Sequence, residues 1–342
     1  MDNFDDNMQE LFANLEAAAT TQGFQVDGQA ETTSQIEHST ADSQRATTPV
    51  GTPLQDAPPL LPLQAEQPTY SMSTTFHSGG ANSDTILVSP DHVIFYVDSS
   101  VLLSASQNAF NCLLSPEAMG ATAGPLHVVL VPEHSVLLNV MLHAIYSMSC
   151  SHYNPPLGTL LEAIPALKKY GIPEDHFIAT STPLFAHILA ETPRNPVSVF
   201  LAAAENNLEH LAVASSAHLH SLELHKLTDE MADRMGSRYL QRLFRLHVER
   251  TEYLKRLLLD APKGHEDTLK CGFVEQKRST RAWALAAASL VWDIKPDMPA
   301  SLLRSTLGSL EQQLECDACK ASLTARIRQV VLDWLTNAKS TI

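Results

Sequence analysis

The chain has few basic residues for its length. Its 342 residues include 23 Lys and Arg against 38 Asp and Glu, and the formal net charge is −15. A protein that binds nucleic acid or anionic lipid through charge presents a basic surface to the phosphates. We therefore expect neither nucleic acid nor a membrane surface to be a direct partner.

Long apolar runs and cysteines are also scarce. The longest nearly uncharged apolar run, residues 282–292, is much shorter than the ~20 residues that a membrane-spanning helix needs. Residues 1–6 contain three aspartates and lead into no apolar signal-peptide core. The five cysteines are an odd number, which is typical of a reducing compartment rather than of a disulfide scaffold. We expect an intracellular protein of the cytoplasm or nucleus.

The acidic residues are concentrated near the N-terminus. Residues 1–80 hold 11 acidic residues and one basic residue, and residues 28–80 are rich in Gln, Ser, Thr, Pro and Ala. Such a composition buries too little apolar surface to offset the entropy lost on ordering the backbone. It predicts a disordered acidic tail over residues 1–81.

One short segment of this tail has a helical apolar pattern. Five apolar side chains recur between residues 4 and 15 on one helix face. Such a segment can fold into a partner's groove, and it also resembles an acidic-aromatic activation segment. The alternative interpretation is an acidic tail that only promotes solubility. The candidate partner-binding residues are Phe4, Met8, Leu11, Phe12 and Leu15.

The ordered region begins with strand signals near residue 82. β-branched runs at 84–88 and 92–97, separated by Ser89-Pro90-Asp91, predict a hairpin. A helix with its apolar face from Val101 to Leu113 should follow. Further along the chain, the patterns predict a strand at 126–131 and helices at 134–148 and 160–170.

Several side chains in this region keep the spacing of a known family. Phe95, Leu102, Ser106, Phe110 and Leu113 follow the central pattern of the BTB/POZ domain. Two later matches are Val131-Pro132-Glu133, which ends a strand, and Ile145-Tyr146, which closes a helix. Asp98-Ser99 stands where the family has His-Lys. The sequence of residues 82–182 therefore resembles a BTB/POZ domain.

The remaining residues, 183–342, show only helical patterns. Helices are predicted from Thr228 to about Leu259, over 279–292, over 300–314 and over 323–338, and Trp283, Trp292 and Trp334 are expected in their core. The local pattern Arg281-Ala282-Trp283, Trp292 and Pro296-Asp297 is similar to uncharacterised fungal BTB-domain proteins. The predicted fold is an α+β N-terminal domain followed by an all-α C-terminal region.

The resemblance implies a protein–protein interaction module and no enzymatic activity. Related domains form homo- or heterodimers through the first helix and an edge strand, and some serve as substrate adaptors of cullin ubiquitin ligases through helices that here span about 183–260. The alternative is a transcription-linked scaffold that uses the acidic N-terminal segment. The residues expected to form the interaction or fold motif are Phe95, Val101, Leu102, Ser106, Phe110, Leu113 and Tyr146.

A C-x-x-C motif, Cys316-Asp317-Ala318-Cys319, lies between two predicted helices. A redox motif of the thioredoxin type would follow a strand, and none is predicted here. Structural zinc needs two more ligands, for which Cys271 and His265 are the candidates. The third interpretation is reduced cysteines packed as small apolar side chains. Apart from zinc, the sequence predicts no cofactor and no convergent catalytic set.

Overall fold

The computed structural model describes residues 69–78, 83–119 and 126–342. These described residues divide into two compact units, one with those up to Ser99 and those between Met119 and Ser135, and the other with Ser100–Ala118 and Val136–Ile342. The candidate interacting tail residues Phe4, Met8, Leu11, Phe12 and Leu15 lie outside the described residues.

The first unit contains a four-stranded sheet of order β1-β3-β2-β4. β2 (Thr85–Val88) and β3 (Val93–Val97) form the predicted antiparallel hairpin, and β4 (His127–Leu130) runs parallel to β2. Alternate side chains point to the same side of a strand, and one such set packs into an apolar cluster. The cluster consists of Ile86, Val88, Ile94 and Val128, with Tyr70, Tyr96, Leu126 and Leu130 packed against it.

The sheet begins earlier in the chain than the sequence predicts. β1 (Ser71–Met72) lies within the segment 1–81 that composition predicts to be disordered, and it pairs in parallel with β3. The backbone N–H of Ser71 donates to the carbonyl of His92 at 3.0 Å, and that of Ser73 donates to the carbonyl of Ile94 at 2.9 Å. This pairing with a distant strand is a tertiary contact, which composition alone does not reveal.

The second unit is helical. Its N-terminal part holds nine short helices, some of a single turn. They are α2 (Ser99–Ala105), α3 (Pro116–Met119), α4 (Ser135–Ile145), the 3-10 helix η1 (Ser151–Tyr153), α5 (Leu157–Lys169), α6 (Glu174–Phe177), α7 (Pro183–Glu191), α8 (Pro196–Glu205) and α9 (Glu209–Ser216).

The prediction of one helix over residues 101–113 is wrong for residues after 105. α2 ends at Ala105, and residues 109–112 have positive φ angles between 52° and 64°. Ser106 redirects the chain, because its Oγ accepts from the Phe110 N–H at 2.8 Å and donates to the Tyr170 carbonyl at 2.7 Å. Phe110 reaches the core by this turn, and its ring centroid lies 4.3 Å from that of Tyr170.

Gly171 allows the close approach that this turn requires. Its φ is +72°, and a Cβ at this position would lie 2.5 Å from Asn108 Oδ1. The Gly171 carbonyl accepts from the Gln107 N–H at 2.8 Å. A side chain here would be strained by both its backbone conformation and this contact.

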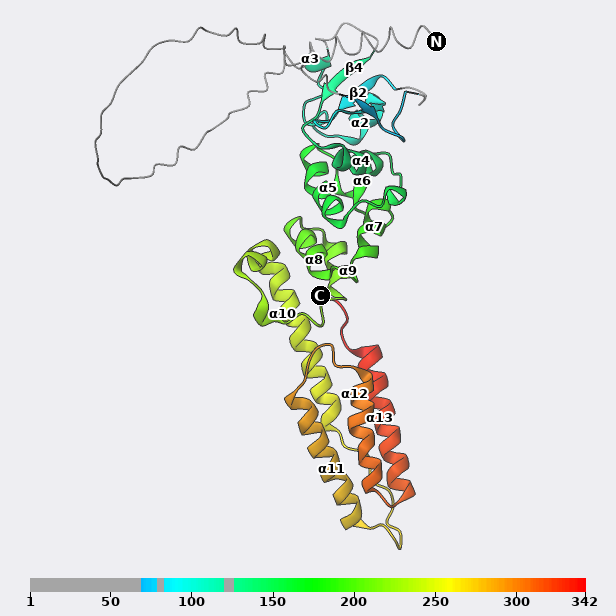
Figure 1. Ribbon diagram of the computed structural model, residues 1–342. Helices are drawn as coiled ribbons and strands as arrows, with labels where there is room; N and C mark the ends of the chain where they lie inside the picture. Colours follow the sequence, from blue (N-terminus) through cyan, green and yellow to red (C-terminus); the bar gives the residue numbers. More distant parts are fainter. Residues whose placement is uncertain (1–68, 79–82, 120–125) are drawn as a thin grey trace, which may run out of the picture. The chain divides into compact units, whose positions relative to one another are not determined.

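Four helices and two 3-10 turns form the C-terminal part. Figure 1 shows the long helices side by side, coloured from yellow to red. Thr228 caps the first of them by accepting from the Met231 N–H at 3.2 Å, as predicted. The elements are η2 (Leu224–Lys226), α10 (Asp229–Leu259, with a kink at Gly236), α11 (Phe273–Trp292), α12 (Ala300–Gly308), η3 (Ser309–Gln313) and α13 (Asp317–Asn337).

Two of these helices start about six residues before their predicted beginnings. α11 starts at Phe273 because the carboxylate of Glu275 accepts from the Gly272 N–H at 3.0 Å. α13 starts directly after Cys316, which is its N-cap residue. Neither glycine nor cysteine has the side-chain oxygen by which Ser, Thr, Asp and Asn mark a helix start, so the periodic apolar pattern alone places both starts too late.

The core of this bundle contains two of the three tryptophans. Trp283 and Trp334 are buried, and their Nε1–H groups donate to the carbonyls of Leu258 and Met298, each at 2.9 Å. Trp292, which the sequence places in the core, is 89% exposed. The prediction for Trp292 was wrong because α11 buries only a narrow stripe, which includes Ala287 and Leu290.

No helix in residues 69–78, 83–119 or 126–342 combines the length and apolar character needed to cross a lipid bilayer.

Candidate metal centre

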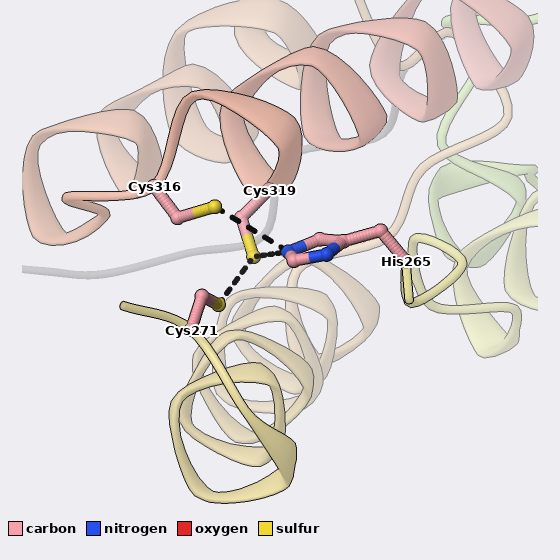
Figure 2. A group of neighbouring side chains, drawn as sticks. All are labelled: His265, Cys271, Cys316 and Cys319. Atoms are coloured by element: carbon pink, nitrogen blue, oxygen red, sulfur yellow. Dashed lines mark hydrogen bonds between the residues drawn. The ribbon is translucent and has the colours of Figure 1, made fainter. Parts of the chain in front are cut away.

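The structure brings together the four residues that the sequence singled out as metal ligands. His265 and Cys271 lie in the connection between α10 and α11, and Cys316 and Cys319 lie at the start of α13. Figure 2 shows their side chains converging on one point. The four candidate ligand atoms all lie within 4.8 Å of one another. The cluster can therefore hold a metal ion.

The start of α13 places two sulfur atoms on the same side of the helix. Cys316 is the N-cap residue and Cys319 lies in the first turn, and residues three apart on a helix are neighbours on its surface. The Lys320 N–H donates to the Cys316 carbonyl at 3.0 Å, which closes this turn. The C-x-x-C spacing and the helix start together fix half of the site.

The connection that carries His265 is held by Gln276 of α11. The Gln276 Oε1 accepts from the His265 N–H at 3.1 Å, and its Nε2 donates to the His265 carbonyl at 3.0 Å and to Asp267 Oδ1 at 3.1 Å. One amide side chain thus fixes the backbone of the loop. Nothing in the sequence pattern identified Gln276, since it is an ordinary polar residue on a helix.

Cys271 is presented by a tight backbone turn. Thr268 and Cys271 form an isolated antiparallel bridge, in which the Thr268 N–H donates to the Cys271 carbonyl at 2.9 Å. The Thr268 Oγ1 also accepts from the Cys271 N–H at 3.1 Å. The turn directs the thiol inward, and Cys271 is only 1% exposed.

Three of the six distances between the ligand atoms fit a tetrahedral zinc site. His265 Nε2 lies 3.4 Å from Cys316 Sγ and 3.3 Å from Cys319 Sγ, and Cys271 Sγ lies 3.6 Å from Cys319 Sγ. For Zn–S of about 2.3 Å and Zn–N of about 2.05 Å, tetrahedral geometry puts sulfur ~3.8 Å from sulfur and ~3.6 Å from nitrogen. Each observed separation is within a few tenths of an ångström of these values.

The orientation of the imidazole suits it to metal binding. His265 Nδ1 lies 2.7 Å from the carbonyl oxygen of Glu266, which can only accept a hydrogen bond. Nδ1 therefore carries the proton in the neutral ring, and the lone pair of Nε2 faces the sulfurs. Metal-binding histidines are commonly oriented by such a bond to the other ring nitrogen.

The three thiols differ in how readily they ionise. Backbone N–H groups at the start of α13, first that of Cys319, lower the pKa of Cys316 to about 7. Burial raises the pKa of Cys271 to about 12 and also raises the pKa of Cys319. In the metal-free chain, one thiolate is readily available near neutral pH. The other two need the positive charge of a bound ion to lose their protons.

The comparisons with known proteins found nothing similar to the chain. No family model matches it, and neither the curated proteins nor the solved structures yielded a match.

The residues proposed for an interaction or fold motif fall into two groups. Phe95, Leu102 and Phe110 are at most 2% exposed, so they lie in the core and cannot line a surface. Val101, Ser106, Leu113 and Tyr146 are partly buried. On α2, Leu103, which the sequence did not single out, is more exposed, at 37%.

Proposed function

We propose that this chain is a non-catalytic protein-binding module. In this proposal its N-terminal region is a BTB/POZ-like domain that pairs with other polypeptides, and its C-terminal helical bundle is braced by a structural zinc ion. The main observation behind a non-catalytic role is that four side chains converge as ligands for one metal ion, namely His265, Cys271, Cys316 and Cys319. Two further observations support the rest, namely the connectivity of the sheet and the helices that follow it.

A structural role for the metal follows from the donor set. Four protein ligands complete a tetrahedron and leave no position for water or substrate, whereas catalytic zinc sites keep one position open. Thiolate and imidazole donors suit zinc and disfavour magnesium or calcium, which prefer oxygen. The ion would join the α10–α11 connection to the start of α13, two segments more than forty residues apart in sequence.

The BTB-like assignment is supported by the order of the elements. A hairpin (β2, β3) and a helix (α2) are followed by a crossover to β4, which lies parallel to β2. Helices α4 and α5 come next. The same order of elements underlies the resemblance of residues 82–182 to a BTB/POZ domain. Ser106 matches the serine of the family pattern, and its hydroxyl group bonds to the backbone of Phe110 and Tyr170.

Pairing with a second copy of the chain is the form of interaction that we propose. α2 presents Leu103 at its surface, 37% exposed, while Leu102 beside it is fully buried. Burial of such apolar side chains against a partner is the main source of interface affinity. A more specific version is a cullin adaptor that also uses the helices between residues 183 and 260.

Light scattering during size exclusion tests the pairing. The full chain of 37.4 kDa is expected to elute as a dimer, at about twice that mass. Leu103→Asp should shift it toward monomer, because a carboxylate would be desolvated at the interface. Leu285→Asp is the matched control, since Leu285 is 74% exposed on α11, and it should leave the dimer unchanged. A monomer at every concentration would contradict the proposal.

Metal analysis tests the zinc site. The chain purified under reducing conditions is expected to carry one zinc per molecule by native mass spectrometry. Cys316→Ser should lose most of it, because one of four ligands is removed. Cys112→Ser is the control, since Cys112 is an exposed free cysteine outside the cluster. A purified chain that holds no metal and takes up no added zinc would contradict the assignment.

A further inference from the structure

We propose that Cys271 and Cys319 form a redox modification site, in which hydrogen peroxide or another hydroperoxide joins the two thiols into a disulfide and so releases the metal. This inference rests on the proposed metal site. It adds a chemical reaction of the same residues and a class of small-molecule oxidant that reacts with them.

A direct sulfur–sulfur contact is the basis for choosing this pair. Cys271 Sγ lies 3.6 Å from Cys319 Sγ, and both Cys316 Sγ and Cys319 Sγ also lie near His265 Nε2, at 3.4 Å and 3.3 Å. A disulfide needs the sulfurs at ~2.05 Å, so an approach of about 1.5 Å completes the bond. Figure 2 shows the two sulfurs facing each other from the α10–α11 connection and from α13.

A cavity beside Cys319 has room for a small oxidant. Cys319 is 8% exposed, and it lines a cavity of about 170 Å³ between the α10–α11 connection and the helices α11 and α13. Water occupies ~30 Å³ per molecule in the liquid, so the cavity accommodates a molecule the size of hydrogen peroxide. The other lining residues include Lys263, Phe273, Gln276 and Ser322.

The reaction balances as a two-electron oxidation. The sulfur of Cys319 attacks one peroxide oxygen, so that an S–O bond forms, the O–O bond breaks and one water leaves. The sulfur of Cys271 then attacks the Cys319 sulfur, which forms the S–S bond, breaks the S–O bond and releases a second water. In total, two zinc-bound thiolates, one hydrogen peroxide and two protons from the solvent give one disulfide, two waters and a released zinc ion.

The disulfide would replace the metal as the link within the bundle. Once Cys271 and Cys319 are joined, His265 and Cys316 are the two ligands left, and two ligands hold zinc far more weakly than four. The new covalent bond spans the same two segments that the ion joins. Oxidation should therefore release zinc while the bundle stays tied together.

Peroxide treatment of the zinc-loaded full chain tests the proposal. Zinc release is followed with a chromogenic chelator, and the disulfide is located by non-reducing peptide mapping with mass spectrometry. We expect one zinc released per disulfide formed and a linked peptide pair that contains Cys271 and Cys319. Cys112→Ser should behave like the unmodified chain, and Cys271→Ser should not form the link.

The other outcomes separate this inference from the metal proposal. A link mainly between Cys316 and Cys319, or zinc release with only sulfinic acids formed, would overturn the assignment of the pair. If the chain binds zinc but keeps its thiols reduced in peroxide, the redox proposal fails and the metal site stands. If the chain binds no zinc but the Cys271–Cys319 link forms, the metal proposal fails and the redox pair stands.

Discussion

Removing the metal is expected to lower the melting temperature of the C-terminal bundle by roughly 10 °C. An ion that binds only the folded chain, present at about a thousand times its dissociation constant, stabilises the fold by ~4 kcal/mol, and each ~1 kcal/mol moves the melting temperature of a region this size by ~2–4 °C. Without the ion, fewer contacts hold the α10–α11 connection to α13. One that remains is the Ser322 Oγ donating to the Lys263 carbonyl at 2.6 Å.

The measurement is thermal unfolding of the full, reduced chain by circular dichroism, with and without a strong zinc chelator. Added zinc should restore the melting temperature, and added magnesium should not, because the donors are sulfur and nitrogen. Cys316→Ser serves as the internal control, since its melting temperature should be low already and should not fall further with chelator. Identical melting curves in all conditions would refute a stabilising metal.

The second large effect concerns two tryptophans of the same helix. Trp283→Ala is expected to destabilise the bundle by about 3–5 kcal/mol, the usual cost of truncating a buried aromatic side chain. Trp283 is 1% exposed, and the substitution also leaves the Leu258 carbonyl without its 2.9 Å hydrogen bond. Trp292→Ala, nine residues further along α11, should change stability by less than about 0.5 kcal/mol because this side chain is 89% exposed.

Urea unfolding followed by circular dichroism compares the two variants directly. Trp283→Phe is a useful intermediate, because it keeps an aromatic ring in the core while it removes the Nε1–H donor and part of the buried volume. It should cost about 1–3 kcal/mol, the penalty for leaving a buried acceptor unpaired. Equal losses for Trp283→Ala and Trp292→Ala would mean that the packing of α11 differs from the one described.

The candidate metal site shows which ligands sequence spacing can predict and which it cannot. The C-x-x-C of Cys316 and Cys319 is local, so its ability to hold one ion could be predicted directly. Cys271 and His265 were named as candidates for the two further ligands that a zinc ion needs. Their convergence depends on Gln276 and on the turn at Thr268, and those hydrogen bonds have no signature in the sequence.

The helix after β3 shows where local reasoning fails. The apolar spacing from Val101 to Leu113 is compatible with one continuous helix, yet the chain turns at Ser106 and runs through four residues of positive φ. A left-handed backbone at non-glycine residues is locally unfavourable. It is offset here by burial of Phe110 against Tyr170 and by the hydrogen bonds of Ser106. The two contacts with Tyr170 join residues sixty or more positions apart in sequence.

By itself, the sequence determined the local features of this protein: the hairpin of β2 and β3, the capped start of α10 at Thr228, the concentration of acidic residues near the N-terminus and the paired thiols of α13. These follow from periodicity, capping and composition, which act over a few neighbouring residues. The tertiary structure alone decided that Trp292 faces solvent, that β1 joins the sheet and that four ligands meet at one point. Such features depend on which surfaces pack together, and the energy of that packing comes from residues far apart along the chain.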